Sequence, residues 1–280
     1  MTTSTMKWTQ RDVEAAAKVL ASASAVGAPL PTLTDEEVVA LDGVQHEQLV
    51  ALPWLSTQDT NKEILCAVAL RGLLAKELVY PVIFEGETEP SRLHATDEIT
   101  GALTLRRSGK NVVSVERTVS TGRRWLYGYV HDEGVLLEEV DDGGLHGFTV
   151  ITRDQLVPRL AEFVDPEQAA ARDTDPTVYS EAEFEAHAAT ALADTQAASN
   201  VVAFNSDTNE FPTVTVYTGP SGVHVLTPRV EGSSDSGLPE QSEAVSFELK
   251  ETSAASLARI LGGLAGQGGS AGLGGSAGQA

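Results

Sequence analysis

Asn111-Val112-Val113-Ser114-Val115 is the stretch that decides the fold, because it returns later in the chain as Asn200-Val201-Val202-Ala203-Phe204. The segment that follows it, Trp125-Leu126-Tyr127-Gly128-Tyr129-Val130, returns as Thr213-Val214-Thr215-Val216-Tyr217-Thr218. Phe148-Thr149-Val150 then leads to a segment with Leu156 and Leu160, just as Phe247-Glu248-Leu249 leads to one with Leu257 and Leu261. The offset is about 89 residues for the strands and about 100 for the final helix, and a repeat of this length bounds the architecture.

Each copy is predicted to contain a helix, three strands, a fourth strand and a closing helix. In the first copy the strands are expected at residues 112–119, 125–131, 135–140 and 147–151, joined by short polar turns such as the one ending at Gly134. In the second copy Ser180 is expected to cap a helix that runs to about residue 198, before a strand at 201–205. The predicted fold class is therefore α+β, with two pseudo-repeated units of antiparallel strands flanked by helices and a helical N-terminal region. Strand–hairpin–helix units also resemble one another through shared physics, so the sequence leaves open whether the repeat is a true duplication.

The first 94 residues read as helical. Thr9 is expected to cap a helix over 10–25, Thr34 and Glu37 form a capping-box pattern, residues 46–52 are weakly helical, and residues 58–79 predict the longest helix of this half. The predicted domain division is 1–94 for the helical N-terminal region, 95–176 and 177–262 for the two repeats, and 263–280 for a Gly-rich tail. Residues 165–176 are the predicted linker. The tail is expected to be disordered because it has too few apolar residues to offset its ordering entropy.

Composition limits the function classes. The formal net charge is −21, and residues 111–280 hold 25 acidic and 9 basic side chains, so a nucleic-acid backbone would be repelled. Acidic surfaces of this kind favour cationic partners. The chain has one cysteine, no apolar run of signal-peptide length and no stretch that approaches a membrane span. We therefore expect a cytoplasmic protein with no membrane insertion.

The sequence contains few residue patterns that indicate catalytic chemistry. His131 and His146 flank an acidic run, and such residues can bind zinc or manganese, but they lack the helical spacing that fixes metal geometry. Cys66 lies in the most apolar predicted helix, where burial would raise its pKa and leave it inert. No nucleophile elbow or phosphate loop is present. We predict no catalytic residues, no metal and no cofactor, and we keep an enzyme built on His131, His146 and nearby carboxylates as an alternative.

A second alternative is a transcription-associated protein. Residues 61–79 have a pattern of apolar and charged residues that resembles a helix of a winged-helix domain, but such domains need a basic recognition face. Residues 1–110 hold 15 acidic and 10 basic side chains, so no nucleic-acid binding is expected.

Two segments are predicted to contact a protein partner. Trp54 and Leu55 lie in a Pro-broken apolar segment, and Trp is enriched among interface anchors. Arg123, Arg124 and Trp125 lie at a predicted hairpin. For the segment of Trp54 and Leu55, the competing interpretation is that the tryptophan covers the edge of the protein's own hydrophobic core.

The pattern as a whole resembles the EspG family, the cytosolic chaperones of type VII (ESX) secretion. The resemblance is carried by residues 109–164 and 200–264, in particular by the hairpin over 213–230 and by Val245-Ser246-Phe247-Glu248-Leu249 leading into the Leu-rich helix at 253–261. The chain departs from that family in beginning with an Ala-rich helical region. The resemblance implies a mixed fold with pseudo-two-fold halves and no reaction. It also implies capture of a helical secretion substrate of the PE–PPE or WXG type, whose apolar tip is kept soluble.

Overall fold

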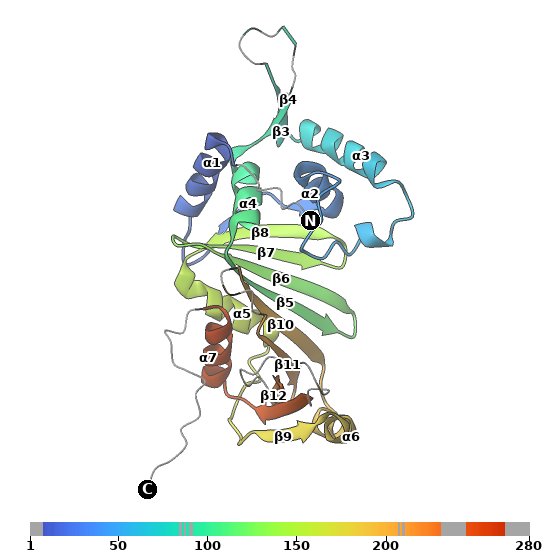
Figure 1. The fold of residues 1–280 in the computed structure, drawn as a ribbon, viewed down its shortest axis with the longest axis vertical. Helices are drawn as coiled ribbons and strands as arrows, with labels where there is room; N and C mark the ends of the chain where they lie inside the picture. Colours follow the sequence, from blue (N-terminus) through green and yellow to red (C-terminus); the bar gives the residue numbers. More distant parts are fainter. Residues whose placement is uncertain are drawn as a thin grey trace, which may run out of the picture.

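A computed structural model describes residues 8–83, 86, 88–89, 92–206, 208, 211–230 and 245–266. Its main feature is one long antiparallel sheet with helices on both faces (Figure 1). Within these residues no helix is long and apolar enough to cross a membrane. The α+β class predicted from the sequence is confirmed.

The sheet runs in the order β1-β8-β7-β6-β5-β10-β11-β12-β13-β9, and β2 also pairs with β8. The first half supplies β1 (Ala28–Pro29), β2 (Leu33–Thr34), β5 (Asn111–Val119), β6 (Gly122–Val130), β7 (Val135–Asp141) and β8 (Leu145–Ile151). The second half supplies β9 (Thr177–Ser180), β10 (Ala197–Asn205), β11 (Thr213–Gly219), β12 (Gly222–Val230) and β13 (Val245–Glu251). The two halves meet where β5 pairs with β10, with Val115 opposite Val201. From this seam each half extends outward through four strands in chain order, so the two predicted repeats have the same topology and share one sheet.

The residue alignment of the first strand pair was wrong by one position. Leu126 and Val214 lie 88 positions apart, as do Val135 and Val223, and all four are buried in the same core. At that offset Val113 corresponds to Val201, which is buried, whereas the predicted offset of 89 matches it to the half-buried Val202 on the opposite face. The error has a simple cause, because a shift of one residue turns every side chain of a strand to the other face.

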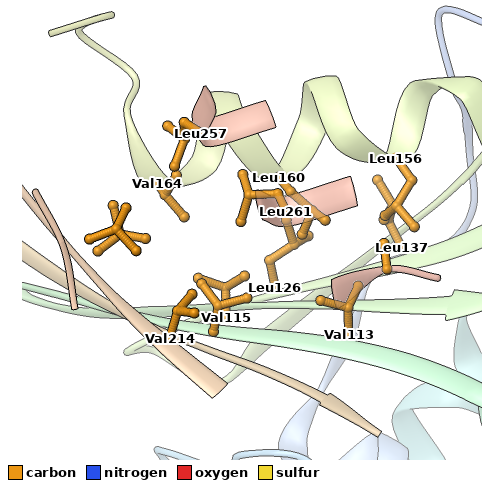
Figure 2. Close-up of a cluster of buried hydrophobic side chains, with 14 of the residues drawn as sticks. Val113, Val115, Leu126, Leu137, Leu156, Leu160, Val164, Val214, Leu257 and Leu261 are labelled. Carbon is orange, nitrogen blue, oxygen red and sulfur yellow. The ribbon is translucent and has the colours of Figure 1, made fainter. Parts of the chain in front are cut away.

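The helices are α1 (Gln10–Ala21), α2 (Asp35–Asp42), α3 (Lys62–Ala75), α4 (Asp97–Ser108), α5 (Leu156–Val164), α6 (Glu181–Ala191) and α7 (Ala254–Leu264), with short 3-10 turns at Leu55–Thr57 and Arg153–Gln155. Of these, α5 and α7 lie side by side on one face of the sheet and close the two repeats. Leu160 and Leu261 are fully buried there, over Val115 and Val214 (Figure 2). These leucines are 101 positions apart, as are Leu156 and Leu257, so the predicted correspondence of the closing helices is confirmed.

The opposite face of the first half is covered by the N-terminal helices. Trp125, Tyr127 and Tyr129 of β6 are buried there, in a core that also includes residues of α1, α2, α3 and α4. The N-terminal region is not only helical, since β1 and β2 join the edge of the main sheet and β3 (Val79–Val82) pairs with β4 (Arg92–Ala95) in a separate two-stranded ribbon. The capping box of Thr34 and Glu37 is confirmed.

Several predicted boundaries were wrong. The helix expected over 10–25 ends at Ala21, the helix expected over 58–79 spans Lys62–Ala75, and residues 46–52 form bends and irregular backbone. In the second half α6 ends at Ala191, and β10 begins at Ala197. Helix propensity alone predicts a helix that continues through Val79 and Ala197. In the structure both residues form strands, because they pair with other strands in the tertiary fold.

The predicted linker is packed against the rest of the molecule. The Asp165 carboxylate accepts hydrogen bonds from the backbone amides of Ala169 and Ala170, and Ala170 is buried in the core under α5 and α7. Asp173 accepts hydrogen bonds from the backbone amide and hydroxyl of Ser253, which hold its pKa at about 2. The tail boundary also moves, because α7 continues to Leu264 and Ala265 is buried. Residues 267–280, where disorder was predicted, lie outside the described residues, and the domain division itself stays a prediction.

Candidate functional site

The second half of the sheet has a face that no described helix covers along β10 and β11. Asn200, Val202 and Phe204 of β10 and Thr213, Thr215 and Tyr217 of β11 are half-buried or exposed. The alternating residues of the same strands, Val201, Val214 and Val216 among them, are buried under α7. We call the first six residues the open strip. Its apolar members are extended by Phe211, which is 60% exposed and stacks on Phe204 with ring centroids 5.1 Å apart.

The first half shows what covers the corresponding face there. At the offset of 88 residues, Trp125, Tyr127 and Tyr129 of β6 correspond to Thr213, Thr215 and Tyr217 of β11. The three aromatic side chains of β6 are at most 8% exposed because α1, α2 and α4 pack over them. In the second half α6 lies further out, where Phe184 contacts Phe247 of β13 and His187 contacts Tyr179 of β9. The open strip is therefore bounded on one side by α6 and on the other by the first half's helical layer (Figure 1).

A second feature is a buried ionic cluster beneath that helical layer. His146 of β8 is fully buried, with Nδ1 2.7 Å from an oxygen of Glu138 and Nε2 2.8 Å from an oxygen of Asp35. The other oxygen of Glu138 accepts hydrogen bonds from Nε of Arg106 at 2.8 Å and from the Tyr129 hydroxyl at 2.6 Å. Arg106 also pairs with Asp42 of α2 at 2.8 Å. The cluster ties α2 and α4 to three neighbouring strands, β6, β7 and β8.

The geometry fixes the charge of His146. Both ring nitrogens lie within hydrogen-bond distance of a carboxylate, and a carboxylate only accepts, so both nitrogens must donate. Burial alone would lower the pKa of His146, but the hydrogen bonds and the negative charges of Asp35 and Glu138 outweigh it and raise that pKa. Burial would likewise raise the pKa of Glu138, but Arg106 and His146 lower it. The cluster is therefore built from opposite charges: the carboxylates of Asp35, Asp42 and Glu138 face His146, Arg106 and Arg107, the last of which pairs with Asp42 at 2.7 Å.

The cluster has no position for a substrate or a metal. His146 has no exposed surface and no free lone pair, and His131 lies outside the cluster, where its Nε2 donates a hydrogen bond to the Leu105 carbonyl oxygen. Burial lowers the pKa of His131. Among the described residues no group of histidine, cysteine and carboxylate side chains is arranged to hold a metal ion. Cys66 is 4% exposed and burial raises its pKa, as the sequence predicted.

The five predicted partner-binding residues do not form one surface. Leu55 is 2% exposed and Trp125 is 6% exposed, so both belong to the protein's own cores and have almost no surface to offer a partner. Trp54 is half-buried and packs against the core that contains Leu55, which agrees with the interpretation of this tryptophan as a cover for the edge of its own core. Arg123 lies 5.3 Å from the centre of the Trp125 ring, while Arg124 points to the other face, above Phe163 and paired with Glu139. A contact role for Trp54, Arg123 and Arg124 stays a prediction.

The outward face of α3 bears on the winged-helix alternative. The helices α1, α2 and α3 precede the β3–β4 ribbon along the chain. However, the exposed face of α3 presents Ile64 and Val68, with Arg71 as its one cation and Glu63 beside it. A face of this composition lacks the basic footprint that nucleic acid requires.

Sequence reasoning missed the open strip, and of the ionic cluster it singled out only His146 and the acidic run that contains Glu138. On β11 the strip has Thr213 and Thr215 where the buried face of β6 has Trp125 and Tyr127, a signal that becomes visible once the repeats are aligned in the correct register. The members of the cluster are spread from Asp35 to His146 and give no local motif.

Comparisons with known proteins give a likeness to solved structures alone. No family model matches the chain, and no curated protein sequence matches it. Among solved structures the chain is similar to the Mycobacterium tuberculosis type VII secretion system chaperone EspG5, in a structure that holds it in complex with a PE25–PPE41 dimer. The TM-score is 0.49 with 9% sequence identity, over 84% of this chain and 95% of the other.

Proposed function

We propose that this protein is a non-enzymatic scaffold that binds a helical protein partner on the open strip and keeps that partner soluble. The single observation that carries the proposal is the contrast between equivalent faces of the two halves. In the first half helices cover the face, and in the second half the same face is left open along β10 and β11.

The internal repeat indicates the kind of element that fits the strip. In the first half, elements of the same chain pack as helices on the strand face that corresponds to the strip. A sheet face of this width buries its apolar side chains against helices or another sheet, and the molecule itself uses helices. The net charge of −21 favours a partner helix flanked by lysine or arginine.

The partner class follows from the sequence resemblance to the EspG family. We propose a helical secretion substrate of the PE–PPE or WXG type, bound in the cytoplasm before export. The role would be that of a chaperone, in which the strip shields the apolar surface of the substrate without any chemical reaction.

The test is co-purification from the native host with the wild-type chain and with Val202→Arg. Val202 lies in the middle of the strip, and an arginine there would bury an unpaired charge against an apolar helix. We expect the amount of recovered helical partner to fall about tenfold, which corresponds to about 1.4 kcal/mol of binding free energy.

Val178→Arg is the matched control. Val178 is 52% exposed on β9 and lies opposite Glu248 of β13, on the face away from the strip. This control should bind like the wild type. Recovery of no helical partner by the wild-type chain under mild salt, or equal recovery with Val202→Arg, would overturn the proposal.

A further inference from the structure

Helix α3 carries an apolar face that points away from the molecule. Ile64 and Val68 are 59% and 60% exposed, and Ala67 and Ala75 on the same side are exposed as well. The opposite side of α3 buries Cys66, Ala69 and Leu73 against α2 and the core. A helix that is apolar on all sides is normally buried on all sides. Figure 1 shows α3 at the periphery of the molecule, with no other element outside it.

The charges on this face have a symmetric arrangement. Glu63 and Arg71 lie four residues before and four residues after Ala67, which places them about 6 Å along the helix on either side of it. Both are exposed, and neither forms an ion pair within the described part of the chain. In contrast, the exposed cation Lys76 just after α3 is paired with Glu37.

From this arrangement we infer that α3 is a self-association surface, on which α3 of a second copy packs antiparallel about a two-fold axis at Ala67. An isologous contact of this kind places Glu63 of each copy at the height of Arg71 of the other, so the pair forms twice. The small side chain of Ala67 lets the helices approach, and Ile64 and Val68 fill the seam on either side of the axis. The occupant is a second copy because the helix is complementary to itself in charge.

The dimer is expected to be weak. A helix of 14 residues is about 21 Å long, and one helical face of that length buries less than the roughly 800 Å² per partner of a standard interface. We expect a reversible monomer–dimer equilibrium, with monomer at about 1 µM and dimer at about 100 µM protein. This contact is separate from the open strip, so a test of the dimer does not test the proposed function, and the reverse also holds.

Sedimentation velocity over that concentration range, with a set of charge variants, provides the first test. Because of the two-fold symmetry, Glu63→Arg or Arg71→Glu each replaces two attractions by two repulsions and should weaken the dimer about tenfold. The double variant E63R/R71E restores both pairs in reversed sense and should recover the wild-type equilibrium. Circular dichroism of each variant checks that the helix content is unchanged. A wild-type chain that stays monomeric to about 300 µM, or a double variant no better than the single ones, would refute the inference.

Disulfide trapping tests the register. In a Cys66→Ala background, Ala67→Cys places a thiol beside the axis, where the two copies approach each other. Ala75→Cys is the matched control, because it lies on the same exposed face but eight residues from the axis, so its two copies would be about 24 Å apart. Mild oxidation should cross-link the first variant and leave the second monomeric. Equal cross-linking of both would indicate random collision and count against the dimer.

Discussion

His146 is a cation held between two carboxylates at a fully buried position, and the fold sets its charge. Asp35 approaches one ring nitrogen from α2 and Glu138 approaches the other from β7. Asp35 also accepts a hydrogen bond at 2.8 Å from the backbone amide of Leu55, so the same carboxylate positions the 3-10 turn beside α2. Removing one partner from such a cluster leaves an uncompensated buried charge, which costs about 3–5 kcal/mol.

The pH dependence follows from the directions of the two pKa shifts. The pKa of His146 is raised in the folded state, so its contribution to stability is fully present below about pH 6.5 and is lost as the pH rises through the raised value. The pKa of Glu138 is lowered, so its contribution is present above about pH 4.5 and is lost as the pH falls through the lowered value. The cluster therefore contributes most between these limits.

We predict that His146→Gln destabilises the protein most near pH 6 and progressively less as the pH rises. A glutamine amide can donate to one carboxylate but carries no positive charge, and it leaves the other carboxylate without the hydrogen bond that His146 supplied. Urea unfolding of wild type and variant from pH 5 to pH 9 measures the difference in the free energy of unfolding. His131→Gln is the control, because burial lowers the pKa of His131 and its neutral ring should give a difference that changes little above pH 6. A pH-independent cost at His146 would show that the ring is neutral.

At the scale of elements, α5 and α7 act as one unit. They occupy equivalent positions in the two repeats, and Leu160 and Leu261 meet between them in the same core (Figure 2). Together they join two halves that are otherwise connected through the β5–β10 seam.

A double-mutant cycle tests this coupling. Leu160→Ala and Leu261→Ala should each cost about 2–5 kcal/mol, because both side chains are fully buried. Residues that share one contact are not additive, so the double variant should deviate from the sum of the two costs by about 0.5–3 kcal/mol. Chemical denaturation of the four proteins gives the coupling term. A value near zero would mean that the two helices pack independently.

Helix α6 differs from the other helices in that none of its described side chains is buried. It is held by ring contacts of Phe184 and His187 at the edge of the sheet and by the capping box of Ser180 and Glu183. We predict that its backbone amides exchange with solvent well before those of α7, because few apolar contacts oppose its local opening. Hydrogen–deuterium exchange with peptide resolution compares residues 181–191 with 254–264. Equal protection of the two helices would show that α6 has further support.

At the scale of the whole molecule, the continuous sheet makes the two repeats one structural unit. β5 and β10 pair over their full lengths, and α5 and α7 pack on each other above the seam. The sequence suggested a linker and separable domains, but the packing of residues 165–173 against α7 and the core opposes independent behaviour.

We predict a single cooperative unfolding transition. All three tryptophans, Trp8, Trp54 and Trp125, lie in the first half, so tryptophan fluorescence follows that half alone. Far-UV circular dichroism follows both halves. The two signals should give the same midpoint and the same slope in urea, as expected for a two-state system. A second transition seen only by circular dichroism would mean that the second half unfolds separately.

The sequence by itself determined the fold class, the repeat, the succession along the chain of the strands in the two repeats, and the caps at Thr34 and Ser180. These features depend on the spacing of residues that are close in the sequence, such as the alternation of buried residues in a strand or a hydroxyl three residues before a carboxylate. Such spacing can be read from the sequence without knowledge of the tertiary structure.

Only the tertiary structure decided which face of each strand is covered, where helices give way to strands, and which distant charges meet. The open strip exists because no described helix packs over β10 and β11, and the cluster at His146 exists because α2, α4 and three strands converge on one point. Both depend on contacts between residues up to 111 positions apart. The free energy of such contacts comes from burial, and the burial of a residue depends on distant segments that its own local sequence does not specify.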